Sequence, residues 1–95
     1  MELIMRIKSH PGGILKRQYM EPLDLSARQL AEALGVPPNR VADIVRERRN
    51  ITADTAIRLS RYFGTTAQFW MNLQTNYDLS VAEAQTDYSS ILECA

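Results

Sequence analysis

The stretch LGVPPNRV at residues 34–41 breaks a helical pattern and lets it resume at once. Gly35 is suited to the left-handed backbone that ends many helices. Pro37 and Pro38 cannot continue a helix, but proline is well suited to a first helical turn, where its missing N–H is not needed. The break therefore predicts two short helices joined by a tight turn and set at a sharp angle.

Each of the two flanking helices has one apolar side. The first is predicted to begin after Ser26, a good N-cap, and to end at Gly35. The second is predicted over about residues 38–47. Its inward side holds Val41, Ile44 and Val45, and its outward side holds Asn39, Asp43 and Arg46. Arg40 and Glu47 lie at the flanks between the two sides. This arrangement is typical of a helix-turn-helix, whose second helix enters the major groove of DNA.

Charge is distributed unevenly, although the formal net charge of the 95 residues is zero. Residues 26–61 hold seven arginines and four acidic residues, a balance of +3, whereas residues 62–95 hold four acidic residues and no basic one. Arginine suits planar contacts to phosphate and guanine. An ordinary solvated face and a purely structural hairpin are the alternatives, and we favour DNA binding because an arginine cluster follows the second helix: Arg46, Arg48 and Arg49.

Composition limits the remaining function classes. A chain of 95 residues with 45% hydrophobic content predicts a single small domain without a membrane helix or a secretory signal, and so a soluble cytoplasmic protein. With one cysteine, Cys94, and one histidine, His10, neither a disulfide framework nor a zinc site is expected. No catalytic constellation is evident, so we expect neither an enzyme nor a cofactor, and we interpret His10 as a helix-start residue.

Three further helices complete an all-α prediction of five helices. They are expected over about residues 11–20, from Thr52 or Asp54 to Gly64, and from Thr66 to about residue 79. The last of them carries a stripe of large side chains that suits both core and dimer interface: Phe69, Trp70, Leu73 and Tyr77. We favour core for Phe69 and Leu73, and a dimer interface for Trp70 and Tyr77.

Each end of the chain holds a short apolar run, LIMRI at residues 3–7 and YSSIL at residues 88–92. Both suit short strands that pair with each other or with a second copy. Frayed termini are the alternative, and both interpretations are kept.

Several motifs together resemble one family: Ser9-His10-Pro11-Gly12, Glu21-Pro22-Leu23, ITADTA at 51–56, FWMNLQ at 69–74 and Tyr77-Asp78-Leu79. They resemble the HigA-type antitoxins of the Xre helix-turn-helix superfamily over residues 9–79. The resemblance implies a phage-repressor-like (lambda repressor-like) fold and a bacterial homodimer that binds a palindromic operator of its own operon. It also implies a partner, a small basic RelE-like ribonuclease toxin that the chain neutralises. The whole chain, 1–95, is then one domain with a core at 9–79, an N-terminal arm at 1–8 and a C-terminal tail at 80–95.

The resemblance also implies roles for individual residues. The groove-facing helix falls on Pro38 to Arg46, with three residues in base-reading positions: Asn39, Arg40 and Asp43. Two groups are placed at the phosphate backbone, one on each side: Ser26, Arg28 and Gln29; and Arg46, Arg48 and Arg49.

The chain departs from the family pattern at three points. The stretch after the groove helix reads Arg46-Glu47-Arg48-Arg49 without the usual glycine, so we expect Asn50 to take the left-handed position and the helix to end later. The usual glutamate after His-Pro-Gly is Gly13. Asp43 is expected to orient Arg40 and Arg46. The alternative is that the Asp43 carboxylate accepts a hydrogen bond from a cytosine amino group.

Three functions are therefore considered. The first is an operator-binding antitoxin, and the second is a solitary Xre-type regulator without a toxin. The third is a protein-interaction module that has lost DNA binding, which would agree with the zero net charge and the missing glycine.

Overall fold

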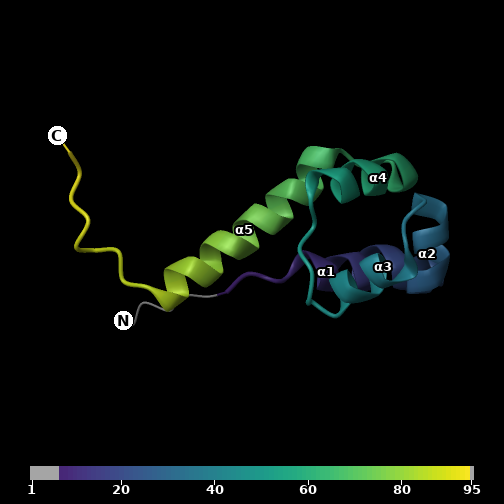
Figure 1. The fold of residues 1–95 in the computed structure, drawn as a ribbon, viewed down its shortest axis with the longest axis horizontal. Coiled ribbons are helices and arrows are strands. Elements are labelled where there is room, and N and C mark those ends of the chain that lie inside the picture. The colour runs from purple at the N-terminus through teal and green to yellow at the C-terminus, as the bar shows by residue number, and fades with distance from the viewer. Residues whose placement is uncertain (1–6, 95) are drawn as a thin grey trace.

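Helices account for all the regular structure in the computed structural model, which describes residues 7–94 (Figure 1). In chain order the elements are α1 (Pro11–Ile14), η1 (Leu15–Met20), η2 (Glu21–Leu23), α2 (Ala27–Leu34), α3 (Pro38–Val45), α4 (Ala53–Phe63) and α5 (Ala67–Gln85). The all-α, five-helix prediction is confirmed. The strand predicted at 88–92 does not form, because this segment is extended or turned without a partner strand within residues 7–94, and residues 3–6 of the other predicted strand lie outside the described part.

The first predicted helix is continuous but changes its winding along its length. Four α-helical residues lead into the π-helical η1, and the 3-10 turn η2 contains Pro22. The run ends at Asp24, which has a φ of 54°, and the Leu25 N–H donates to the Met20 carbonyl at 2.9 Å. Leu15 and Met20 from η1 are buried in the core. The altered winding therefore still turns apolar side chains into the core.

The predicted helix starts are confirmed by side-chain caps. Ser26 and Gln29 cap α2 reciprocally, with hydrogen bonds of 2.9 and 3.0 Å between each side chain and the other's backbone N–H. The hydroxyl groups of Thr52 and Thr66 accept hydrogen bonds from the first turns of α4 and α5. Each cap satisfies backbone donors that the helix itself leaves without partners.

Trp70 lies at the centre of the hydrophobic core, so the prediction that it contributes to a dimer surface is wrong. Its side chain has no exposed surface, and its indole N–H donates to the Thr65 hydroxyl at 2.7 Å. Phe69 and Leu73 pack against this core and remain partly exposed. The core residues are Leu15, Met20, Leu30, Ala31, Leu34, Val36, Val41, Ile44, Ile51, Ala56, Leu59 and Trp70. The large side chains on one side of the last helix did not show which of them fills the centre of the core, and it is the largest, Trp70.

The His10-Pro11-Gly12 segment joins α1 to both α3 and α5. The His10 Nδ1 accepts a hydrogen bond from the Gly12 N–H at 2.9 Å, and its ring packs edge-on against Tyr77 of α5 with centroids 4.8 Å apart. Burial lowers the pKa of His10, although the charges of Glu47 and Asp78 act in the opposite direction. A neutral imidazole is the form that accepts this hydrogen bond.

Gly12 is needed because the backbone of α1 meets the end of α3. A Cβ at this position would lie directly against the Ile44 carbonyl oxygen and 2.7 Å from its carbonyl carbon. At the neighbouring Gly13 a Cβ would meet only the guanidinium end of Arg17, at 3.0 Å, which is free to move away. The two adjacent glycines therefore differ sharply in what they tolerate.

Gly12→Ala is expected to lower the free energy of unfolding by about 3 kcal/mol, the upper end of the usual cost of overpacking. Gly13→Ala is the matched control and should raise it by about 0.5–1 kcal/mol, since alanine favours a helix over glycine. Urea unfolding of the two variants and the unsubstituted chain checks both values. Equal destabilisation by the two substitutions would contradict the close approach of α1 to α3.

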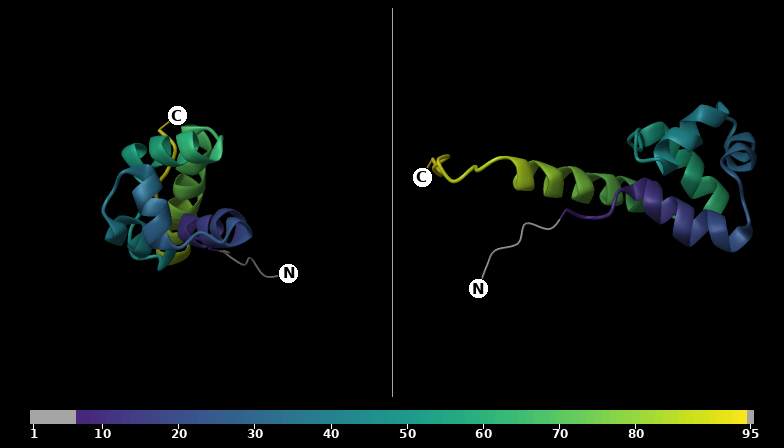
Figure 2. Two further views of the ribbon diagram at one scale, coloured as in Figure 1. Left: turned by 90° about the vertical axis from the view of Figure 1, so that its right-hand side faces the viewer. Right: turned by 90° about the horizontal axis from the view of Figure 1, so that it is seen from below.

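Helix α5 and the segment that follows it extend well beyond the other helices, and the molecule measures 49 × 29 × 21 Å (Figure 2). It continues past the predicted end at Leu79 to Gln85. The N-terminal segment lies beside it, and the Lys8 N–H donates to the Ser80 hydroxyl at 2.9 Å. Residues 86–94 follow without helix or strand. None of the helices in residues 7–94 has the length and apolar character needed to cross a membrane.

Candidate nucleic-acid interface

The turn between α2 and α3 has the conformation that the glycine and the two prolines predict. Gly35 has a φ of 72°, and the Val36 N–H donates to the Ala31 carbonyl at 3.0 Å. Val36 and Ala31 are both buried, so an apolar contact accompanies the left-handed helix end. Pro37 has an extended backbone and Pro38 opens α3. The sharp angle between α2 and α3 therefore follows from local sequence.

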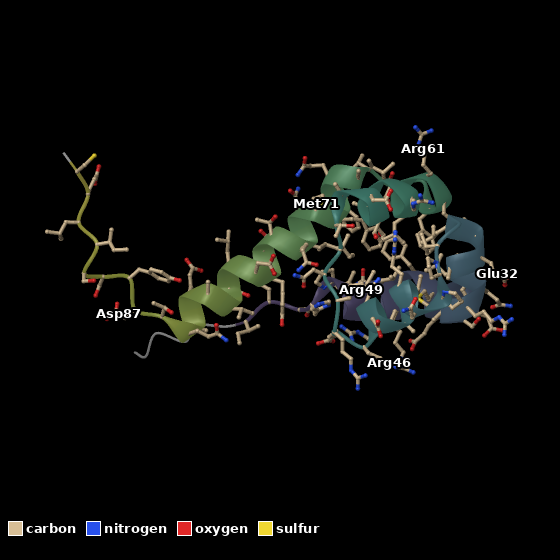
Figure 3. The ribbon with its side chains drawn as sticks, in the orientation of Figure 1. Glu32, Arg46, Arg49, Arg61, Met71 and Asp87 are labelled. Atoms are coloured by element: carbon tan, nitrogen blue, oxygen red, sulfur yellow. The ribbon has the colours of Figure 1, made fainter. Side chains whose placement is uncertain are left out.

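Helix α3 presents one polar face to the exterior. Val41 and Ile44 are buried against the body, while Asn39 and Arg46 are exposed, as is Pro38 at the helix start. Figure 3 shows Arg46 extending away from the bundle below α3. Asp43 is half-buried on the same side of the helix. The predicted division of α3 into an inner and an outer face agrees with these exposures.

Arg40 lies at the flank of α3 and is held by an ion pair. Its Nη1 atom lies 2.8 Å from the Asp54 Oδ2 atom at the start of α4, and 29% of its side chain is exposed. The same Asp54 oxygen accepts a hydrogen bond from the Arg58 Nε at 3.0 Å. The hydrogen bonds from Arg58 and Arg40 lower the pKa of Asp54. Arg58 in turn donates through Nη1 to the Leu34 carbonyl at 2.8 Å, at the end of α2.

These contacts connect the end of α2, the side of α3 and the start of α4. From the sequence, Asp54 was predicted only as a helix-start residue, and no role was predicted for Arg58. The spacing of four residues between Asp54 and Arg58 on one helix was a usable signal for their pairing. The contact with Arg40 joins different helices, and no local spacing predicts it.

The expectation that Asp43 orients Arg40 and Arg46 is wrong. The structure places Asp43 next to Arg49, with 4.0 Å between the carboxylate and the guanidinium. Arg40 has turned to Asp54 instead. Within residues 7–94, no ion pair joins Asp43 to Arg46.

The end of α3 also differs from the prediction. The helix stops at Val45, and Glu47 rather than Asn50 takes the left-handed backbone, with a φ of 64°. The Glu47 N–H donates to the Ile44 carbonyl at 2.9 Å, and the Arg48 N–H donates to the Asp43 carbonyl at 2.8 Å. These two bonds are those of the common left-handed helix end, here formed without glycine. The helix therefore ends earlier than predicted, and three exposed arginines surround this end: Arg46, Arg48 and Arg49.

Glu47→Gly is expected to raise the free energy of unfolding by about 1 kcal/mol. A left-handed backbone costs a residue with a side chain about 1–2 kcal/mol, and the greater freedom of glycine in the unfolded chain offsets part of that gain. Glu47→Gln is the control, because it removes the charge and keeps the strain. Thermal or urea unfolding measures both, and equal gains would show that charge rather than backbone strain limits stability here.

The structure places the remaining predicted residues on the surface at the start of α2. Ser26, Arg28 and Gln29 are all exposed, and the capping hydrogen bonds fix the Gln29 side chain against Ser26. On the other side of α3, a shallow cleft brings Arg40 and Arg49 together. The cleft is lined by Arg40, Arg49, Asn50, Thr52, Asp54 and Thr55. Within residues 7–94, no cluster of His, Cys, Asp and Glu side chains is placed to hold a metal ion.

Comparison with known proteins relates this arrangement to a family. The helix-turn-helix family model matches residues 16–70. Virulence-associated protein I of Dichelobacter nodosus is 55% identical over 83 residues, which are 87% of this chain and 77% of that protein. The solved structure of the Pseudomonas aeruginosa antitoxin HigA with the higBA promoter has a TM-score of 0.87 and 47% identity, covering 95% of this chain and 100% of that one. The solved structure of antitoxin GraA in complex with its operator has a TM-score of 0.89 and 41% identity, covering 100% and 98%.

Proposed function

The chain belongs to the Xre-type helix-turn-helix family, and on that premise we propose that it is an antitoxin that binds operator DNA and represses its own operon. The observation that carries the proposal is the polar outer face of α3 within a fold shared, at 41–47% identity, with two antitoxins solved on promoter or operator DNA. This is a family of DNA-binding proteins and not of enzymes, as the sequence analysis expected. The proposed site of action is the bacterial cytoplasm, where that DNA lies.

The proposed contacts follow from exposure and charge. The first turn of α2 offers backbone N–H groups and the positive end of a helix dipole to a phosphate. The outer face of α3 offers an amide and a guanidinium, which are the groups that read adenine and guanine edges. We assign base contacts to Asn39, Arg40 and Asp43, and phosphate-backbone contacts to Ser26, Arg28, Gln29, Arg46, Arg48 and Arg49, with Pro38 at the start of the groove-facing helix.

Binding of the operator is tested by fluorescence anisotropy with DNA from directly upstream of the gene and with a shuffled sequence, at two salt concentrations. The upstream DNA should bind more tightly, and the affinity should fall with salt because phosphate contacts release counterions. Arg40→Ala should cost about 1–3 kcal/mol on the operator and relax the preference at one base pair.

Arg61→Ala is the matched control for this substitution. Arg61 is exposed on α4 and extends from the opposite side of the molecule to Arg46 in Figure 3. Its loss should leave operator affinity nearly unchanged. Equal binding of the unsubstituted protein to both DNAs would refute operator recognition and favour a protein-interaction module.

We propose a homodimer as the binding species, since a palindromic operator presents two equivalent half-sites. Exposed apolar side chains concentrate where α5 extends beyond the bundle and in the segments next to it. They are Ile7, Leu79, Tyr88, Ile91 and Leu92, exposed by 54, 57, 48, 74 and 84%. The other large apolar side chains exposed within residues 7–94 lie apart, on η2 and α4: Leu23, Ile57 and Tyr62. Pairing of this surface between copies would remove apolar area from water. The interface thus lies beyond Trp70, toward the end of α5.

Leu79→Glu is expected to convert the dimer to a monomer and to weaken operator binding at least about tenfold, because a buried unpaired charge opposes association. The side chain is 57% exposed, so the fold itself should persist. Gln68→Glu adds the same charge near the start of α5 and is the control. Light scattering gives the mass, and an unchanged mass for Leu79→Glu would place the interface elsewhere.

The toxin partner is also proposed, as a small basic RelE-like ribonuclease. The support is the antitoxin character of the two solved relatives and the charge of residues 62–95, which hold four acidic residues and no basic one. Co-expression with the product of the adjacent gene, followed by purification and a ribonuclease assay, tests the pair. Failure of the two products to associate would favour a solitary regulator that binds the operator without a toxin.

A further inference from the structure

Asp54 places a negative charge among the arginines that the proposed function assigns to DNA. It shares the cleft beside α3 with Arg40 and Arg49, and 56% of its side chain is exposed. A carboxylate in this position repels phosphate and so lowers the affinity for DNA of any sequence. Its contacts indicate a role that offsets this loss.

A second arginine, Arg58, holds the Asp54 carboxylate in place. Arg58 donates to it through Nε at 3.0 Å and donates through Nη1 to the Leu34 carbonyl at 2.8 Å, so the anchor reaches the turn between α2 and α3. Asp54 also lies in the first turn of α4, where the helix dipole favours a negative charge. From this fixed position it accepts the Arg40 hydrogen bond at 2.8 Å.

An arginine held in this way behaves differently toward the two kinds of DNA. Non-specific binding depends almost wholly on contacts between flexible cations and phosphates. The Asp54 carboxylate beside Arg40 repels an approaching phosphate, whereas a neutral base edge meets no such repulsion and can use the guanidinium N–H groups that the ion pair leaves free. The pairing therefore lowers non-specific affinity more than specific affinity.

We infer that Asp54 is a positioning residue for DNA recognition, which holds Arg40 away from the phosphates of non-specific DNA and fixes its guanidinium for the operator. This inference rests on the proposed function. The second carboxylate on this side, Asp43, is a weaker candidate because it lies 4.0 Å from Arg49, and no other side chain within residues 7–94 pairs with it.

The test is Asp54→Asn, which preserves shape and removes the charge. Affinity for shuffled DNA should rise about threefold to tenfold, and the slope of log affinity against log salt should steepen by about 0.9, the value of one additional phosphate contact. Operator affinity should change less, so the ratio of operator to shuffled affinity should fall. Damage to the fold would lower affinity and would not steepen the salt dependence.

Two further variants separate the action of Arg40 from the general loss of a negative charge. In an Arg40→Ala background, Asp54→Asn should no longer steepen the salt dependence, and Asp43→Asn alone should produce a smaller gain on shuffled DNA. An equal gain with and without Arg40, or no gain on shuffled DNA, would overturn the inference. If the unsubstituted protein does not prefer the operator, the proposed function fails, while the salt slopes on shuffled DNA still decide whether Asp54 restrains Arg40.

Discussion

The close contact between the backbone of Gly12 and the Ile44 carbonyl fixes the position of α3, on which the rest of the surface depends. Helix α3 has eight residues, too few to be stable alone. The turn at Gly35 holds its beginning, and the start of α1 holds its end. His10 extends this support to α5 through Tyr77, so the helix that faces outward is braced at both ends by the body of the protein.

Most helix boundaries were predictable because the interactions that set them are local. Ser26, Thr52 and Thr66 each cap a helix through a backbone N–H only three residues away. Gly35 ends α2 through its own backbone conformation. The turn and the outward face of α3 followed from one short stretch of sequence, and the all-α fold followed from the start and stop signals of all five helices.

Two of the errors concern contacts between segments that are distant in the sequence, and the end of α3 is a local one. The indole N–H of Trp70 donates to the nearby Thr65 hydroxyl, but the helices that bury its side chain come from the whole chain. The pattern of large side chains along α5 alone therefore could not predict that Trp70 is buried. Glu47 takes a left-handed backbone although a residue with a side chain disfavours it, so the missing glycine did not move the helix end to Asn50. The pairing of Arg40 with Asp54 depends on how α3 meets α4.

Helix α5 separates the apolar end of the molecule from α3, along the longest dimension of the molecule (Figure 1). In the proposed dimer this helix is a rigid arm whose length also sets an orientation. Each residue inserted into it would add about 1.5 Å and turn everything beyond it by about 100°. A single insertion would thus rotate one copy of α3 out of phase with the groove that faces the other. In the proposed dimer, the number of residues in α5 would therefore be tied to the helical repeat of DNA.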